Sequence, residues 1–301
     1  MNAVVWGLKV KPYKRLDGPQ ETFYDALVNG FDLVFDMSAI SWEHGVANRA
    51  FEGKKEDRSR TQFVLSRILS LAEGLLFNAV TSIIVIRLLS SPGHGSPKTT
   101  IFDVDLPPLW RYLKGCLISI FTALSIPGGM RLGFDMVAVT AVLLGSSPIK
   151  WPSTFCSPWR STSVSSFWGY RWHQATRLTF LQFAGRPLAA ITGSRRLGLV
   201  MGTFIASGIV HETGAVRIPA AREKGGQGAL LFFTMQGVGV VLEHLWTKMT
   251  GRRVRGVLGW LWTIGWLTVW GNDFIDRSVR IGMLGILPNE LFSAKVADEA
   301  Q

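Results

Sequence analysis

Residues 68–89 read ILSLAEGLLFNAVTSIIVIRLL, and this stretch decides the class of fold. A helix of about 20 apolar residues crosses the hydrocarbon layer of a bilayer, and this stretch is long enough to do so. Its two charged side chains, Glu73 and Arg87, lie near its ends, where long side chains can reach the polar interface. The stretch therefore predicts a membrane-spanning helix.

Further apolar runs follow at residues 113–126, 132–144, 197–215, 229–246 and 257–270. Pro127, Gly128 and Gly129 separate the first two of these runs and predict a break in the helix there. The short third run fits a span, a re-entrant piece or half of a bent hairpin. We expect an all-α fold, a polytopic membrane bundle of about six transmembrane segments, with five to eight compatible with the pattern.

The composition agrees with a membrane protein. Of the 301 residues 48% are apolar, the mean hydropathy is +0.24, and there are 12 Trp and 18 Phe residues. The formal net charge of +11 suits nucleic acid, an anionic bilayer surface or a phosphate-bearing ligand. Because the basic residues fall between the apolar runs, we expect the lipid bilayer as a partner and not nucleic acid. Cys116 and Cys156 have no spacing typical of a disulfide framework or a metal site.

Three regions are predicted: a polar N-terminal leader at 1–66, a multi-pass membrane domain at 67–290 and a C-terminal tail at 291–301. The first apolar stretch of the leader is too short for a signal peptide, so insertion is expected to rest on internal segments.

Lys and Arg residues predict the orientation in the membrane. They number ten in residues 1–67, seven in 148–196 and four in 248–256, against fewer in the remaining loops. The positive-inside rule places these three regions in the cytosol, provided that residues 113–147 make one net crossing.

The polar loop at 145–196 contains the segment SFWGYRWHQ at 166–174. Ser165 or Ser166 is expected to cap a helix that begins at Phe167, because a serine oxygen accepts from the free amides of a first turn. Trp168 and Trp172 would then be i,i+4 neighbours, and the other face would carry Tyr170, His173 and Arg177.

Two interpretations of this helix stay open. In one, His173 faces a reaction chamber and Arg171 or Arg177 lies near a phosphate-bearing donor. In the other, the helix is an interfacial anchor whose aromatic rings sit at headgroup level and whose arginines meet lipid phosphates.

His211 lies in a segment, GTFIASGIVHETG at 202–214, whose small residues Gly202, Ala206 and Ser207 allow close helix packing. Adjacent His211 and Glu212 are candidates for function, because ionisable groups are costly inside a membrane and imidazole suits a general base. Alternatively both mark the end of the span. His44, His94 and His244 are expected at surfaces or interfaces. No hydrolase elbow, P-loop or dinucleotide fingerprint is present in the sequence.

Three motifs together resemble a known family. They are KWPSTFCSPW at 150–159, SVSSFWGYRWHQ at 163–174 and SGIVHE at 207–212, with weaker support from SWEH at 41–44. Over about residues 40–275 the chain is similar to the wax-synthase-like membrane-bound O-acyltransferases, and more narrowly to the fungal branch that acetylates terpenoids and meroterpenoids. It departs from the family at Tyr170, where a basic residue is commoner, and at its N-terminus, where relatives usually carry further apolar helices.

The resemblance implies transfer of an acyl group from a CoA thioester to a hydroxyl. His211 would be the catalytic base, and His173 would orient or polarise the donor carbonyl. Substrate and CoA binding would fall to Arg171, Trp172, Trp168, Arg177 and Glu212. No metal or bound cofactor is expected, with acetyl-CoA as co-substrate and a small hydroxylated molecule as acceptor.

We therefore expect an acetyl-CoA-dependent transferase of terpenoid-type secondary metabolism in the endoplasmic reticulum membrane. The alternatives are a long-chain acyl-CoA:alcohol transferase of the wax-ester type, or a non-catalytic or transporter-like membrane protein.

Overall fold

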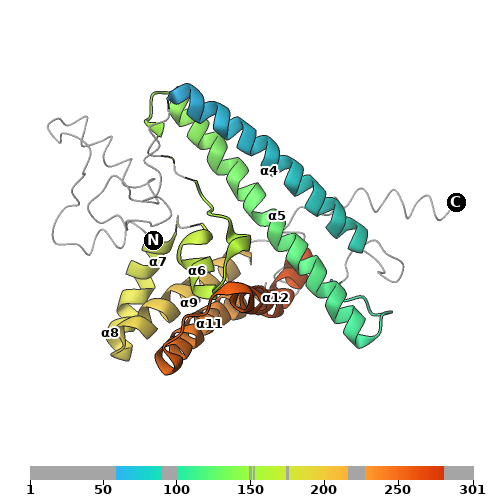
Figure 1. Ribbon diagram of the computed structural model, residues 1–301, viewed down its shortest axis with the longest axis vertical. Coiled ribbons are helices and arrows are strands. Elements are labelled where there is room, and N and C mark those ends of the chain that lie inside the picture. Colours follow the sequence, from blue (N-terminus) through green and yellow to red (C-terminus); the bar gives the residue numbers. More distant parts are fainter. Residues whose placement is uncertain are drawn as a thin grey trace. The chain divides into compact units, whose positions relative to one another are not determined.

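The computed structural model describes residues 59–89, 100–148, 151, 153–173, 176–215 and 228–280. The leader before residue 59, His44, His94 and the tail at 291–301 lie outside these residues. Five long helices are described, namely α4 (Arg60–Leu89), α5 (Pro108–Leu143), α9 (Arg195–Ala215), α11 (Ala229–Thr250) and α12 (Gly256–Arg280) (Figure 1). The described residues contain no strand, which confirms the all-α class.

Short helices fill the region between α5 and α9. They are η2 (Pro158–Arg160), α6 (Val164–Ser166), η3 (Phe167–Arg171), α7 (Arg177–Phe180), η4 (Leu181–Gly185) and α8 (Arg186–Thr192).

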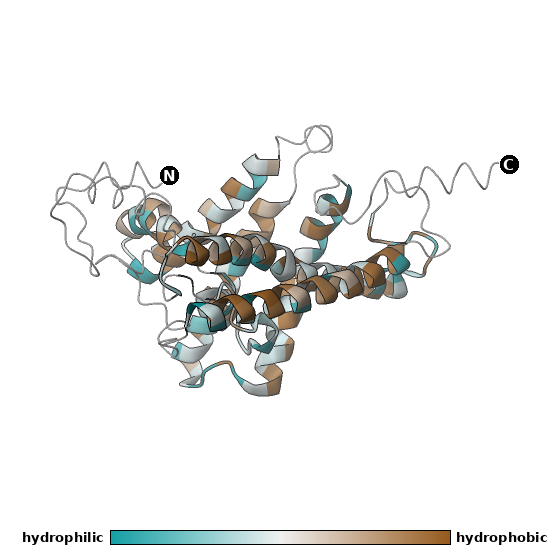
Figure 2. Ribbon diagram, turned by 90° about the horizontal axis from the view of Figure 1, so that it is seen from above, coloured by the Kyte–Doolittle hydropathy of each residue, from teal (hydrophilic) through white to brown (hydrophobic). Residues whose placement is uncertain are grey.

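α4, α5 and α11 are long and apolar enough to cross a membrane. Figure 2 shows hydrophobic residues along the long helices. On α4, large apolar side chains such as Leu69, Leu76 and Ile83 are exposed. Such a surface suits contact with lipid, because soluble proteins rarely leave an apolar face of this extent uncovered.

α4 begins at Arg60, before the predicted start of the span at Ile68, because Ser59 and Gln62 cap its first turn. The Gln62 amide donates to Ser59 Oγ at 3.2 Å, and the Ser59 amide donates to Gln62 Oε1 at 3.2 Å. This reciprocal pattern is a capping box, which satisfies two of the amide groups that a helix leaves free at its start.

The predicted break at Pro127, Gly128 and Gly129 is wrong, since α5 runs through all three residues. Proline removes the hydrogen bond that an amide at position 127 would give to the Ala123 carbonyl, and helices within a membrane bundle tolerate such a loss where neighbouring helices pack against them. α4 packs against this part of α5, where Asn78 Nδ2 donates to the Ser125 carbonyl at 3.4 Å. A Cβ at Gly128 would lie 3.3 Å from the Gly74 carbonyl, so this glycine allows α4 and α5 to pack closely rather than ending α5.

The run at 132–144 is therefore the end of α5 and not a separate segment. Six predicted segments become five long helices in the described part of the chain. A single helix at 108–143 also meets the condition that residues 113–147 make one net crossing, on which the predicted orientation depends.

The described chain divides into two compact units. The first unit comprises the described residues of Met1–Arg67, Phe134–Ser207 and Gln236–Thr263. The second unit comprises those of Ile68–Gly133, Gly208–Met235 and Ile264–Gln301.

The core of the first unit contains Phe63, Ala138 and Val142, with Trp151 packed against it. A buried ion pair lies beside this core. Arg67 Nη1 of α4 is 2.6 Å from Asp135 Oδ1 of α5, and Arg67 Nη2 also donates to the Trp151 carbonyl. Because Trp151 opens the KWPSTFCSPW motif, the ion pair attaches the start of that motif to α4.

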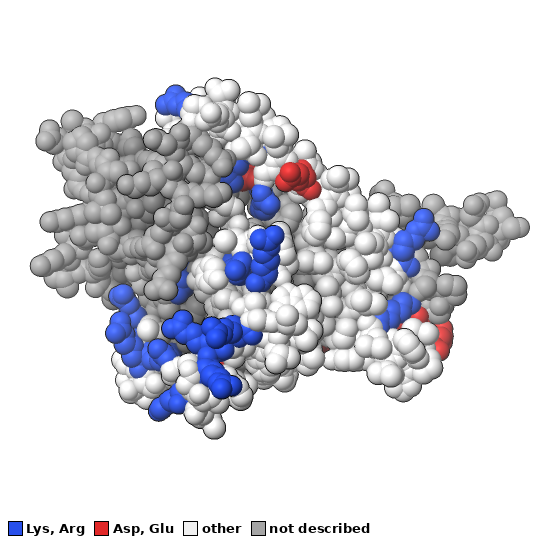
Figure 3. All heavy atoms as spheres, in the orientation of Figure 1, with Lys and Arg blue, Asp and Glu red and all other residues white. Residues whose placement is uncertain are grey.

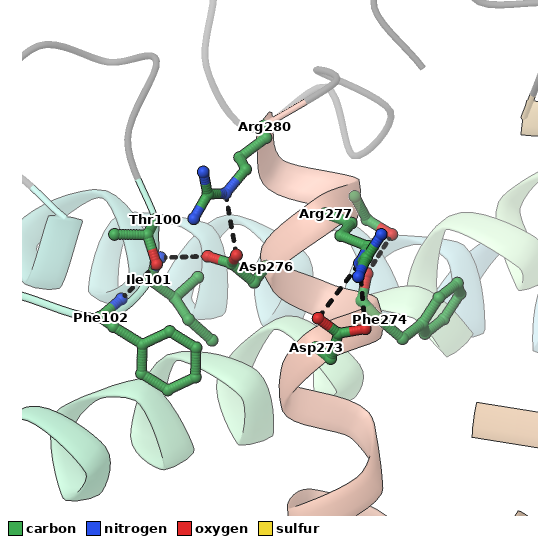
Figure 4. Close-up of polar contacts among 9 residues, drawn as sticks. Thr100, Ile101, Phe102, Asp273, Phe274, Asp276, Arg277 and Arg280 are labelled. Carbon is green, nitrogen blue, oxygen red and sulfur yellow. Dashed lines mark hydrogen bonds and ion pairs between the residues drawn. The ribbon is translucent and has the colours of Figure 1, made fainter. Parts of the chain in front are cut away.

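The core of the second unit consists of Val85, Ile101, Ile118, Ile275 and Val279. Figure 4 shows how α12 holds the chain before α5: the Ile101 amide donates to Asp276 Oδ1 at 2.6 Å, and Arg280 Nε donates to Asp276 Oδ2 at 2.8 Å.

The two units differ in charge. In the first, nine cationic side chains are exposed (Arg60, Arg160, Arg186, Arg195, Arg196, Lys248, Arg252, Arg253 and Arg255), whereas its two described acidic residues, Asp135 and Glu243, are buried. Figure 3 shows Lys and Arg gathered on the surface. In the second unit six described basic residues accompany six acidic ones. The positive-inside rule rests on these same cations, so the orientation of the loops stays a prediction.

Candidate functional site

The predicted site residues fall in two groups. Trp168, Arg171, Trp172, His173 and Arg177 lie in the first unit, where the structure brings them together with the KWPSTFCSPW motif. His211 and Glu212, on α9, lie in the second unit.

The helix that carries the FWGYR sequence begins earlier than predicted. It starts as α6 at Val164 and continues as the π-helix η3 from Phe167 to Arg171. The capping residue is Ser163, whose side chain accepts from the Ser166 amide at 2.9 Å, so the prediction of Ser165 or Ser166 as the cap was wrong. We refer to Val164–Arg171 as the motif helix.

Aromatic rings cluster at the C-terminal end of the motif helix. Trp168 and Trp172 lie 5.7 Å apart between ring centroids, which confirms the predicted aromatic pair. Phe155 of the KWPSTFCSPW motif contacts Trp172 at 5.2 Å and His173 at 6.0 Å, both edge to face. Such pairs stabilise a packed cluster beyond the apolar area that they bury.

The predicted second face of Tyr170, His173 and Arg177 does not exist, because the motif helix ends at Arg171 and Trp172 has extended backbone angles. His173 thus lies beyond the helix, half-buried, with its ring 5.8 Å from that of Trp172. Its position is set by aromatic packing rather than by helical spacing.

Arg171 connects the motif helix to the loop before it. Its Nη1 donates to the carbonyl groups of Cys156 and Ser157 at 3.1 and 3.2 Å, while the Cys156 amide donates to the Arg171 carbonyl at 2.9 Å. Ser157 has a φ of 47°, which is uncommon for a residue other than glycine. The loop conformation is thus held by Arg171.

Arg177 is half-buried and donates through Nη1 to the Gly169 carbonyl at 2.9 Å. Burial lowers the pKa of its guanidinium, because a low-polarity environment disfavours the charged form. This contact places Arg177 beside the backbone of the motif helix.

Two residues of α11 that were not predicted hold the motif helix. Gln236 is fully buried, and its Oε1 accepts from Trp168 Nε1 at 3.3 Å. Glu243 is 5% exposed and accepts from the Val164 and Ser165 amides. Both residues lie within the apolar run at 229–246. Polar and acidic side chains are costly in such a run, and this is the sequence signal that could have indicated them.

His211 lies on α9 and is exposed in the described chain. Its ring stacks on that of Phe233 of α11, with centroids 4.7 Å apart and planes 16° apart. The stacking fixes the plane of the imidazole, which limits the directions in which its nitrogens can accept or donate a proton.

The small residues of α9 pack closely, as predicted. A Cβ at Gly202 would lie 2.6 Å from the Ala184 carbonyl, and one at Gly208 would lie 2.9 Å from Leu230 Cα. Glu212 contacts the start of α11, where its Oε2 accepts from the Leu230 amide at 3.3 Å. An acidic group at a helix N-terminus is stabilising, so Glu212 has a structural role there.

His244 lies half-buried on α11, with its ring beside Arg196 Nη1, at 2.8 Å from Nε2. Cys116 and Cys156 are both free thiols. In the ranges that the structure describes, no group of three or more His, Cys, Asp or Glu side chains is arranged to hold a metal ion.

The long apolar helices are typical of a polytopic membrane protein. The loop between α5 and α9 contains a packed segment of Trp, Arg and His residues, which is a candidate site. Residues 151–235 match the Membrane bound O-acyl transferase family. The resemblance predicted from the three motifs is thereby confirmed.

Fungal and plant relatives agree with this match. The chain is 24% identical over 290 residues to "O-Mevalon transferase yanI" of Aspergillus niger, covering 85% of this chain and 63% of the relative. It is 24% identical over 224 residues to "Acetyltransferase eriL" of Hericium erinaceus, covering 69% and 56%. It is 31% identical over 206 residues to "Probable long-chain-alcohol O-fatty-acyltransferase 7" of Arabidopsis thaliana, covering 65% and 54%.

The chain thus spans less than two thirds of the length of each of these relatives. No solved structure matches it.

Proposed function

We propose that this protein is an O-acyltransferase that moves an acyl group from the thioester of acyl-CoA to a hydroxyl group of a small molecule. The observation that supports this most strongly is the family match at 151–235, which includes both the motif helix with His173 and the α9 segment with His211. Transferase names among the relatives give the same class of reaction.

In the proposed reaction, His211 accepts the proton of the acceptor hydroxyl while the oxygen attacks the thioester carbonyl carbon. His173 donates a hydrogen bond to the carbonyl oxygen, on which negative charge develops. The carbon–sulfur bond then breaks, and the proton held by His211 passes to the CoA sulfur. A base within reach and a donor aimed at the oxyanion each lower the barrier of this step.

Arg171, Trp168, Trp172, Arg177 and Glu212 remain proposed for binding substrate or CoA. The contacts described above support this for the two tryptophans, whose rings form an apolar surface. Arg177 is proposed as a cation that meets a CoA phosphate. Arg171 and Glu212 have partners within the protein, so we propose that they act mainly by shaping the site.

We further propose acetyl-CoA as the donor and a hydroxylated terpenoid-type intermediate of secondary metabolism as the acceptor, in the endoplasmic reticulum membrane. The fungal relatives named acetyltransferase and O-mevalon transferase support this choice. A second candidate is a long-chain acyl-CoA donor with an alcohol acceptor, because a relative of 31% identity has a name of that kind.

The test is an assay of membranes that contain the full chain, with radiolabelled acetyl-CoA and a panel of terpenoid and long-chain alcohols. We expect labelled ester, and we expect His211→Ala to reduce its rate at least about 100-fold at equal protein level, since a positioned base typically contributes that much or more. His244→Ala, at a histidine of α11 bound to Arg196, is the matched control and should retain activity.

Full activity of His211→Ala would refute the proposed base. Ester formation only from long-chain acyl-CoA would favour the second candidate. If no donor is used by membranes with correctly inserted protein, the chain would instead belong with the non-catalytic or transporter-like alternatives.

A further inference from the structure

Glu243 of α11 is a buried carboxylate that connects three elements of the first unit. Its Oε1 accepts from the Val164 amide at 2.6 Å and from Trp262 Nε1 of α12 at 2.9 Å. Its Oε2 accepts from the Ser165 amide at 2.9 Å and from Ser165 Oγ at 2.6 Å. Four donors thus surround a side chain that is only 5% exposed, as a buried negative charge requires.

The partners of Glu243 are the first two amides of the motif helix. A helix leaves its first amides without partners inside the helix, and an anionic group there also meets the positive end of the helix dipole. The next amide, that of Ser166, donates to Ser163 Oγ. Glu243 therefore completes, from another helix, the cap that Ser163 begins.

A second contact to α11 fixes the direction of the motif helix. Trp168 Nε1 donates to Gln236 Oε1, and Gln236 precedes Glu243 by seven residues, which places the two on the same face of α11. One attachment would let the motif helix turn about it, whereas two attachments along α11 hold its axis.

α12 closes the third side of this arrangement. A Cβ at Gly259 would lie 2.3 Å from the Thr162 carbonyl, so α12 is in direct contact with the backbone that precedes the motif helix. Trp262, three residues further on, donates to Glu243. The start of the motif helix is thus held by α11 and α12 together.

We propose that Glu243 is a positioning residue for acyl transfer: it anchors the motif helix and thereby sets the place of Arg171 at its end and of Trp172 and His173 beyond it. It acts through the helix and touches no reactant. The effect on the reaction rests on the proposed function, while the anchoring itself does not.

The experiment compares Glu243→Gln with the wild type, using the full chain in detergent micelles. Glutamine has the same size but replaces one acceptor oxygen by an NH₂ group, which would face the donors that Glu243 now binds. Hydrogen–deuterium exchange is measured for the peptide that covers 160–173, and kcat and KM for the acyl donor are measured on the same sample. Glu73→Gln, at an exposed glutamate of α4, is the matched control.

We expect exchange at 164–171 to rise by about tenfold or more in Glu243→Gln, because loss of a hydrogen bond to a charged group weakens local structure to that extent. We expect kcat to fall by about 10- to 100-fold with a smaller change in KM, because misplacement of a reacting group by about 1 Å lowers the rate to about that extent. Trp262→Phe, which removes one donor to Glu243 but none of its bonds to the motif helix, should change both quantities less.

Unchanged exchange at 164–171 would overturn the anchoring. Faster exchange with unchanged kcat would overturn the positioning role. If the wild type transfers no acyl group at all, the proposed function fails, and the exchange measurement alone decides whether Glu243 anchors the motif helix.

Discussion

The buried ion pair of Arg67 and Asp135 allows a prediction about stability. Arg67 Nη1 is 2.6 Å from Asp135 Oδ1, and the side chains are 9% and 1% exposed. Replacement of Asp135 by Leu would remove the carboxylate from a buried guanidinium, whose other contacts among the described residues are the Trp151 carbonyl and the Phe63 ring, with its centroid 4.9 Å from Arg67 Cζ. Removal of one partner of a buried pair typically costs about 3–5 kcal/mol, because the remaining charge is uncompensated.

We therefore expect Asp135→Leu to reduce the free energy of unfolding by about 3–5 kcal/mol. The double variant Arg67→Met/Asp135→Leu should recover most of this loss, because replacement of a whole buried pair by apolar residues is often neutral or stabilising. The control is the pair of Asp273 and Arg277 on α12, at 3.0 Å with side chains 49% and 39% exposed. Asp273→Leu should cost no more than about 1 kcal/mol, as is usual for exposed pairs.

The assay is reversible unfolding in mixed micelles, followed by tryptophan fluorescence, with the protein level and oligomeric state checked for each variant. A loss for Asp135→Leu no larger than that for Asp273→Leu would refute the reasoning. A double variant as unstable as the single one would show that the loss comes from packing and not from the unpaired charge.

Two other predictions concern the backbone. Gly202→Ala should destabilise the protein by about 1–3 kcal/mol, since the new Cβ would lie 2.6 Å from the Ala184 carbonyl. Gly214→Ala on the same helix would bring its Cβ within 4 Å of nothing, so this variant should be neutral or stabilising by up to about 1 kcal/mol. Thermal unfolding compares the two variants, and equal effects would contradict the close contact at Gly202. Ser163→Ala should cost about 1 kcal/mol by removing the acceptor of the Ser166 amide; chemical unfolding measures this loss, and an unchanged free energy of unfolding would contradict the cap.

The sequence predicted the long helices well because each is an apolar run of sufficient length. The runs at 68–89, 197–215, 229–246 and 257–270 lie within α4, α9, α11 and α12. The break at Pro127 was mispredicted because a local rule for proline and glycine takes no account of α4, which packs against α5 at Gly128. Local patterns report what a residue prefers, and they miss packing against a distant part of the chain.

The same limit applies to the candidate site. The pair of Trp168 and Trp172 followed from their spacing, and the motifs indicated the resemblance that the match at 151–235 confirms. Glu243, by contrast, was not predicted, because its partners Val164 and Ser165 precede it by 79 and 78 residues. The end of the motif helix at Arg171 was also missed: its last five residues form a π-helix, which is rare and has no simple sequence signal, and Trp172 after it has extended backbone angles.

The distance in sequence between Val164 and Glu243 also affects the order in which the protein is made. At about 5–20 residues per second, a ribosome adds the 79 intervening positions in roughly 4–16 s. During this time the motif helix has neither α11 nor α12 to hold it, and a helix of eight residues is not stable alone. His173 and its neighbours therefore reach their final arrangement only after most of the membrane helices have been synthesised.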